Sequence, residues 1–316
     1  MPKLKKVSKN EWAFEADYSR SNMPKDVENF LEQKLKSGEL EQMSPEQVML
    51  ELMTTMPDAL IDLSHEPTQF DELAATAELL QIGSFFEAKL SSESYVTTFP
   101  NDPDGWGMLA STFKMMDEDV SSMLAYRMCI DVYTKDFPKT FDWKKAKIDW
   151  GFLENRPFLT ALSQLALSYA DLDMYEPAIE WAEKLIHLNP TDNIGIRSNL
   201  VKFYLETKQY QKIFNLAKKY PEDTIAVEIP YGEVLAYCYL DDVENAQKTW
   251  LSAQETLPLV AKELAKKRHP KPKNVDGYVT IGGADQAYYY WETSGQYWQN
   301  NVIAQQLIED YRNAKK

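Results

Sequence analysis

A chain of 316 residues with 44% hydrophobic and 26% charged residues has the composition of a folded protein, which excludes wholesale disorder. The formal net charge of −15 repels phosphate backbones and anionic lipid, so it disfavours binding to nucleic acid or to a membrane surface. No apolar run approaches the roughly 20 residues that a membrane span needs, and no apolar segment follows the N-terminal lysines. We therefore expect a cytoplasmic protein without membrane insertion.

Glycine and proline usage predicts an all-α chain. Glycine is scarce, with 11 residues, and most of the 16 prolines fall between segments that have helical apolar spacing. The two cysteines, Cys129 and Cys238, lie within such segments. Buried unpaired thiols are the better interpretation, although two thiols could also form a disulfide.

The N-terminal part divides into a polar stretch and a helical one. Residues 1–23 are polar and of mixed charge and are predicted to form a flexible arm, which Trp12 and Phe14 could dock. Residues 24–100 are predicted to form an N-terminal helical region.

Within that region, residues 59–63 and 73–86 are interpreted as a helix pair, a degenerate form of the repeat described next. An Asn-Asp-Pro-Asp-Gly loop at residues 101–105 follows it.

A helix-turn-helix pattern recurs along the rest of the chain. In residues 156–190, apolar residues three or four apart predict two helices separated by a turn at 171–173. Small residues at Ala166 and Ala178 let these helices approach closely. Matching positions follow at offsets of roughly 33 to 35 residues, and an earlier copy begins at Trp106. The copies define one repeat at 101–138, an irregular connection at 139–157 and three repeats at 158–262.

These spacings resemble the tetratricopeptide repeat family, whose pattern is W-x2-L-G-x2-Y followed by spaced Ala, Phe, Ala and Pro. Only the copy at Trp106 keeps the first tryptophan and no copy keeps the glycine, so the resemblance depends on four copies taken together. It implies a right-handed α-solenoid of helix-turn-helix repeats with a concave binding groove.

A second resemblance covers the C-terminal two-thirds of the chain. It is carried by Trp150–Gly151, Glu154–Phe158, Leu188–Arg197, Gly282–Tyr290 and Tyr297–Trp298. These segments look like a poorly characterised group of repeat proteins, some similar to the suppression-of-tumorigenicity-seven proteins. The resemblance implies a helical repeat fold and no established reaction. The cysteine-rich metal-binding tail of some bacterial members is absent, because no cysteine follows Cys238.

The sequence after the repeats predicts a loop and a cap. Residues 263–283 are interpreted as a basic loop rich in proline and glycine, and residues 284–316 as C-terminal capping helices. A secondary binding surface is predicted at Lys266, Lys267, Arg268, Tyr288 and Tyr289. The cations could instead complement a helix end, and the tyrosines could instead cover the last repeat.

No constellation indicates catalysis or a metal. His65, His187 and His269 are far apart and have no ligand-like neighbours. Gly282–Gly283 follows no predicted strand and precedes no Lys-Ser or Lys-Thr pair, so a phosphate-binding loop is not indicated. We expect no enzyme activity, no cofactor and no metal.

The predicted binding surface is the concave groove. In the tetratricopeptide family the first helix of each pair lines this groove, and its non-core positions point inward. On the registers above these are Ser111, Lys114, Thr160, Ser163, Leu167, Ser198, Asn199, Lys202, Tyr231 and Leu235. Small polar side chains beside a cation and an aromatic ring suit an extended peptide or a helix. The carboxylate clamp of some relatives is not supported, because Ser163 and Leu167 stand where that clamp needs Lys and Asn.

The leading hypothesis is a scaffold or adaptor that binds a protein or peptide in this groove. A peptide-gated regulator is the alternative, and an RNA-associated protein that uses the basic run is a weaker one.

Overall fold

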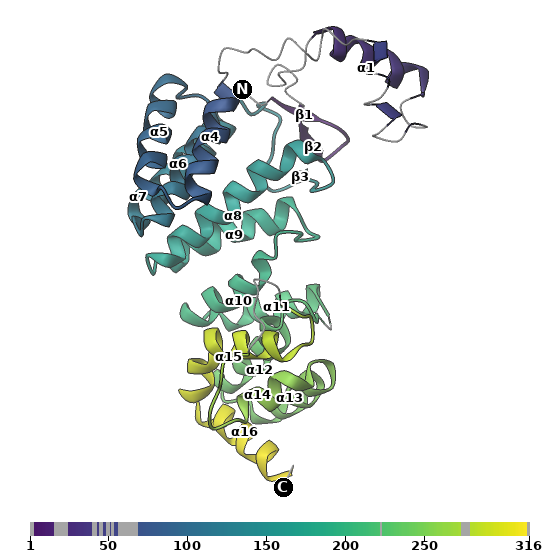
Figure 1. The fold of residues 1–316 in the computed structure, drawn as a ribbon. Helices are drawn as coiled ribbons and strands as arrows, with labels where there is room; N and C mark the ends of the chain where they lie inside the picture. The colour runs from purple at the N-terminus through teal and green to yellow at the C-terminus, as the bar shows by residue number, and fades with distance from the viewer. Residues whose placement is uncertain are drawn as a thin grey trace. The chain divides into compact units, whose positions relative to one another are not determined.

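The computed structural model describes residues 3–15, 25–39, 43, 47, 48, 51, 54, 55, 69–221, 223–272 and 279–314. These residues form α-helices with three short strands, which confirms the predicted all-α class of tetratricopeptide-like helix pairs (Figure 1). The chain has two compact units, one containing Phe14–Pro138 with Met1–Lys5 and one containing Lys139–Lys316 with Lys6–Ala13. Within the described ranges, no helix is both long enough and apolar enough to cross a membrane.

The first unit contains helix α1 (Lys25–Ser37) and two helix pairs. Helices α4 (Gln69–Gln81) and α5 (Phe85–Thr98) form one pair, and α6 (Pro103–Met115) and α7 (Asp119–Thr134) form the next. Because α5 packs against both α4 and α6, the pairs are stacked (Figure 1).

The helix predicted over 73–86 is wrong, since α4 ends at Gln81 and a turn separates it from α5. Gly83 in this turn has a φ of 80°, which glycine adopts without steric cost. The segment 59–63, predicted as the partner helix, lies outside the described residues.

Strands β1 (Leu4–Lys6), β2 (Glu11–Phe14) and β3 (Lys147–Ile148) form a three-stranded sheet in that order. Strand β2 runs parallel to β3, with Trp12 opposite Ile148. Trp12 and Phe14 are each 4% exposed, so the flexible arm predicted for residues 1–23 is wrong over both strands. The Trp12 ring packs edge-on against Phe141, and this burial of aromatic area holds the segment in place.

Three helix pairs follow a short 3-10 helix at Leu153–Asn155 in the second unit. They are α8 (Arg156–Asp171) with α9 (Tyr175–Leu188), α10 (Ile196–Glu206) with α11 (Tyr210–Lys219), and α12 (Glu228–Tyr239) with α13 (Val243–Thr256). Helix α9 packs on α10, α11 packs on α12, and the first helices α10 and α12 also touch each other.

Each helix pair turns through one residue with positive φ. These residues are Gly83 (φ 80°), Asp117 (57°), Asp173 (55°), Lys208 (56°) and Asp241 (57°). A left-handed residue lets the chain reverse between antiparallel helices, and Gly and Asp adopt this conformation more readily than Lys. The repeat in the sequence is therefore also a repeat in backbone conformation.

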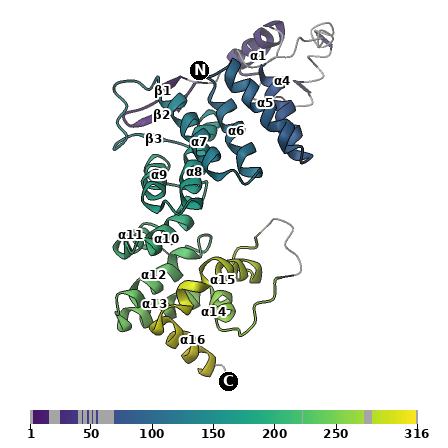
Figure 2. The same ribbon diagram turned by 90° about the vertical axis from the view of Figure 1, so that its left-hand side faces the viewer.

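The chain ends in α14 (Pro258–Leu264), α15 (Ala284–Gln299) and α16 (Val302–Ala314). Helix α15 packs on α12 and α14, whereas α16 packs on α12 and α13 (Figure 2). These helices include the predicted cap and bury a ring cluster in which Trp298, 1% exposed, lies 5.3 Å from the ring centre of Trp250.

Candidate functional site

The predicted groove residues differ widely in exposure. Ser163, Tyr231 and Leu235 are only 3%, 0% and 0% exposed. The prediction that these three residues line an open groove is therefore wrong.

Tyr231 is buried because the C-terminal helices cover the first helix of the last pair. Its hydroxyl donates a hydrogen bond to the Leu257 carbonyl at 2.8 Å and accepts one from the Ala261 N–H at 3.1 Å. Its ring lies 5.5 Å from that of Tyr290 and 6.1 Å from that of Trp298, both on α15. A surface predicted to receive a partner is thus filled by this chain's own helices.

Polar contacts fasten α15 to the repeats. The Tyr297 hydroxyl donates to Glu206 Oε1 on α10 at 2.5 Å, and Tyr239 on α12 donates to the Tyr297 carbonyl at 3.0 Å. Just after α15, the Asn301 side-chain amide donates to the Cys238 carbonyl at 3.1 Å. Burial, together with the hydrogen bond to Glu206, raises the pKa of Tyr297, so its hydroxyl stays protonated and can donate.

The other predicted residues of the second unit remain accessible on α8 and α10. Thr160 and Lys202 are exposed, and Leu167, Ser198 and Asn199 are half-buried. Ser198 is occupied, because its hydroxyl hydrogen-bonds the Glu228 carboxylate.

Asn199 and Lys202 are three residues apart on α10, so they lie on the same side of that helix. Within the part of the chain that the structure describes, neither side chain forms a hydrogen bond or an ion pair. We call Thr160, Leu167, Asn199 and Lys202 the open inner surface. The first helices thus combine a covered region on α12 with an accessible one on α8 and α10.

Ser111 and Lys114 lie on α6 of the first unit. The Ser111 hydroxyl is 3.0 Å from the Gly107 carbonyl and 3.0 Å from the Tyr126 hydroxyl. The Lys114 ammonium lies 2.7 Å from Asp119. Both side chains therefore have partners inside their own helix pair.

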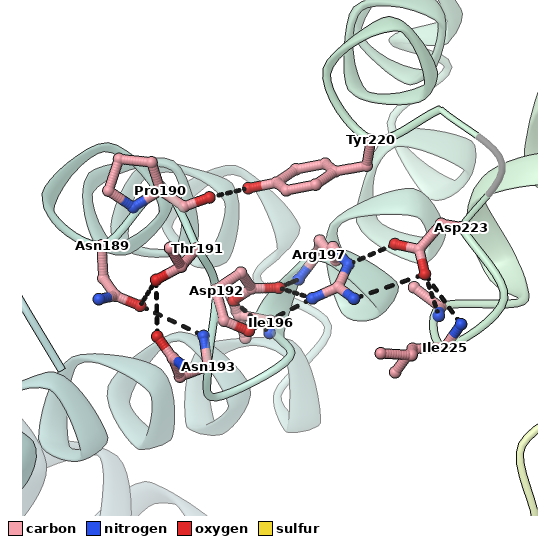
Figure 3. Close-up of polar contacts among 11 residues, drawn as sticks. Asn189, Pro190, Thr191, Asp192, Asn193, Ile196, Arg197, Tyr220, Asp223 and Ile225 are labelled. Carbon is pink, nitrogen blue, oxygen red and sulfur yellow. Dashed lines mark hydrogen bonds and ion pairs between the residues drawn. The ribbon is translucent and has the colours of Figure 1, made fainter. Parts of the chain in front are cut away.

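A buried ion triad joins two connections of the second unit (Figure 3). Arg197, at the start of α10, lies 2.9 Å from Asp192 Oδ2 and 2.6 Å from Asp223 Oδ2. Asp192 also accepts the backbone N–H groups of Ile196 and Arg197, each at 3.0 Å. Each charge is satisfied within the triad, which therefore fixes the α9–α10 connection against the α11–α12 connection.

The connection between α9 and α10 is spanned by the Leu188–Arg197 segment, which carries part of the second sequence resemblance. Asn189 Oδ1 accepts the Asn193 N–H at 3.2 Å, and the Tyr220 hydroxyl donates to the Pro190 carbonyl at 2.8 Å (Figure 3). The Leu188–Arg197 motif is thus accounted for by folding.

The predicted secondary surface is only partly exposed. Lys267 and Arg268 are exposed, but Lys266 pairs with Glu263, a carboxylate that is 3% exposed. Tyr288 is 7% exposed and Tyr289 is half-buried, so an exposed Tyr288 is a wrong prediction. The tyrosines instead belong to the aromatic packing around α15.

A cavity of about 460 Å³ lies beside this surface, between the end of α14, α15 and α16. The His269 ring stacks on Trp291 with 3.7 Å between ring centres, and its Nδ1 lies 3.0 Å from Glu263. Arg312 also lines the cavity and donates to the Ala265 carbonyl at 2.7 Å. His269 and Arg312 therefore already have hydrogen-bonding partners within the chain.

Potential nucleophiles and metal ligands are not assembled. Cys129 and Cys238 are free and buried, as predicted, and burial raises the pKa of both thiols, to about 12 for Cys238. His187 stands beside Lys147, and burial and this cation lower its pKa. Among the described residues, no group of three His, Cys, Asp or Glu side chains could hold a metal ion.

Comparison with protein families identifies the chain. The model described as "Transcriptional repressor TCF25" matches residues 95–301, which extend from α5 to the end of α15. The chain belongs to the Tcf25 family. No curated protein matches it. The suggested likeness to the suppression-of-tumorigenicity-seven proteins finds no support in these comparisons.

The solved structures that resemble this Tcf25 family member include tetratricopeptide repeat proteins. One from Cytophaga hutchinsonii has a TM-score of 0.45 and 13% identity and covers 90% of this chain and 98% of its own. One from Parabacteroides merdae has a TM-score of 0.41 and 16% identity, with 90% and 97% coverage. YrrB, described as a TPR protein with an unusual peptide-binding site, has a TM-score of 0.44 and 9% identity, with 64% and 92% coverage.

Proposed function

We propose that this Tcf25 family member is a protein-interaction scaffold whose open inner surface receives a segment of a partner protein. The proposal rests on the side chain of Lys202, which is exposed on the first helix of a pair. This cation has no partner within the described part of the chain. Asn199, one helical turn away, offers both a donor and an acceptor to a peptide backbone. Together with Leu167 they provide one charged, one amide and one apolar contact.

The family description, a transcriptional repressor, supports a role in transcriptional repression. A chain with a net charge of −15 is poorly suited to neutralise DNA phosphates itself. We therefore propose that it acts in repression by holding other proteins together. Its partner would present a carboxylate to Lys202, because a lone exposed cation selects an acidic group.

Quantitative capture from a native cell extract tests the proposal. Lys202→Glu reverses the charge, and Asn199→Ala removes the amide, at two side chains that are not buried. Lys248→Glu is the matched control, because Lys248 is an exposed cation on α13. Tyr231 is unsuitable for this test, because its truncation would damage the core.

The proposal expects a partner retained by the wild type and by Lys248→Glu but lost with Lys202→Glu. The proposal would be contradicted if all variants retained the partner equally. It would also be contradicted if Lys248→Glu lost the partner to the same extent as Lys202→Glu. Circular dichroism must first show equal helix content.

A peptide-gated regulator is the second candidate, supported by the cover that α15 forms over Tyr231. Displacement of α15 would uncover apolar surface on α12. Hydrogen exchange of the α12 amides should then rise when a partner peptide is added, whereas a rigid scaffold would show unchanged or lower exchange.

A further inference from the structure

A second cavity, of about 250 Å³, lies among α11, α12 and α13 of the second unit. Its walls include Phe214, Lys218, Pro230, Glu233, Thr249 and Ser252. It is separate from the open inner surface, since none of its lining residues belongs to that surface. Two carboxylates, those of Asp223 and Glu233, also line it.

Glu233 is half-buried in this cavity, and its carboxylate forms no ion pair or hydrogen bond within the described part of the chain. Burial raises the pKa of Glu233, as expected for a carboxyl that has lost water and gained no cation. A carboxylate in this state is stabilised by any cation that can enter.

The charged groups around the cavity leave this position open. Lys218 on α11 is exposed and makes no ion pair with Glu233. Asp223 is already paired with Arg197. Glu233 is therefore the carboxylate of the cavity that has no counter-ion among the described residues.

The remaining walls match a long cationic side chain. The Phe214 ring is held against that of Tyr237, with 4.4 Å between ring centres, and Pro230 and Ala253 add apolar surface. Methylene groups can lie on such a surface while a charged head reaches a carboxylate. The hydroxyl of Ser252 can accept further hydrogen bonds from the head.

We propose that this cavity receives a lysine or arginine side chain of a protein partner, with Glu233 as its counter-ion. The net charge of −15 favours the approach of basic segments. The inference deepens the proposed scaffold function, since it adds a basic contact to the partner's chemistry.

Binding of blocked tripeptides to the full chain tests the cavity without the need for a known partner. The probes are acetyl-Gly-Arg-Gly-amide, acetyl-Gly-Lys-Gly-amide and the uncharged acetyl-Gly-citrulline-Gly-amide. Binding is followed by NMR of methyl-labelled protein, because Ile229 and Ala253 line the cavity and supply reporter methyl groups. Saturable shifts of both methyl groups are expected with arginine or lysine and not with citrulline.

Glu233→Gln keeps the shape and removes the charge, and it should weaken binding about tenfold or more. Glu244→Gln is the matched control, because Glu244 is exposed on α13 and does not line the cavity. Equal binding by Glu233→Gln and wild type, or equal shifts with citrulline, would overturn the proposal. The contrast between citrulline and arginine on the wild-type protein decides the question even if Glu233→Gln folds poorly.

Lys202→Glu separates this inference from the proposed function, because it should leave the tripeptide shifts unchanged. If Lys202→Glu loses protein capture but keeps tripeptide binding, the two surfaces bind separately. Failure of one proposal can then be told from failure of the other.

Discussion

Arg197 Nε lies 2.6 Å from Asp223 Oδ2, which joins the first residues of α10 to the connection that leads into α12. Their side chains are only 9% and 8% exposed. Removing the cation would leave two buried carboxylates without a counter-ion, because Asp192 uses the same guanidinium.

Arg197→Met should lower the free energy of unfolding by about 3 kcal/mol. Arg127→Met removes a cation from an exposed pair with Asp131 and should cost less than about 1 kcal/mol. Urea unfolding measures both, and equal losses in the two variants would contradict a buried role for Arg197.

The triad also predicts a loss of stability in acid. Burial disfavours the ionised form of Asp223, but hydrogen bonds from Arg197 and the Ala226 N–H outweigh it and hold the pKa below its ordinary 3.8. The folded pKa is the lower one, so ionised Asp223 contributes fully above pH 3.8 and its contribution disappears as the pH falls below that value.

The stability difference between wild type and Asp223→Asn should therefore be largest near about pH 6 and shrink below about pH 4. Urea unfolding across this range measures it. Asp223→Asn added to Arg197→Met should show no such trend, and a constant difference in the wild-type background would refute the assignment.

Replacement by alanine should have opposite effects on stability at two glycines of α6. A Cβ at Gly105 would lie 2.4 Å from the Tyr95 ring, whose hydroxyl is held by Asp102 at 2.6 Å. A Cβ at Gly107 would meet only Cys129 Sγ, at 3.9 Å. Gly105→Ala should destabilise by about 1–3 kcal/mol, whereas Gly107→Ala should stabilise by up to about 1 kcal/mol. Thermal unfolding of the two variants gives the comparison.

Among the residues with positive φ in the helix-pair turns, Lys208 is the one whose side chain disfavours this conformation most. Its φ of 56° costs a lysine roughly 1 kcal/mol, whereas glycine bears little of that cost. Lys208→Gly should therefore raise the unfolding midpoint in urea. Lys212→Gly, within α11, should lower the free energy of unfolding by about 1 kcal/mol or more, and the midpoint with it, because glycine weakens a helix interior and the ion pair with Glu183 is lost. A lower midpoint for both variants would show that the left-handed turn is not strained.

The sequence predicted the repeats well because their signal is local. Apolar spacing locates the helices around Ala166 and Ala178, and both alanines are fully buried as expected. The turn at Gly83 was missed because apolar residues continue across it at helical spacing, although the glycine itself is a signal for a helix end and has a positive φ in the structure.

The groove was predicted less well because its exposure depends on contacts between distant segments. Tyr231 has the correct helical position for an inward-facing residue, but Trp298 packs against it from 67 residues further along the chain. The aromatic spacing of α15 predicted a covering helix, yet spacing cannot say which face it covers. The pairing of Trp12 with Ile148 was missed for the same reason.

The two buried cysteines allow the local opening of each unit to be measured separately. Cys129 belongs to α7 in the first unit and Cys238 to α12 in the second, and both thiols are 2% exposed or less. A thiol reagent can modify them only when the surrounding helices come apart, so each modification rate reports a local opening event. Loosening the second unit at Arg197 would accelerate labelling of Cys238 and leave the rate at Cys129 unaltered.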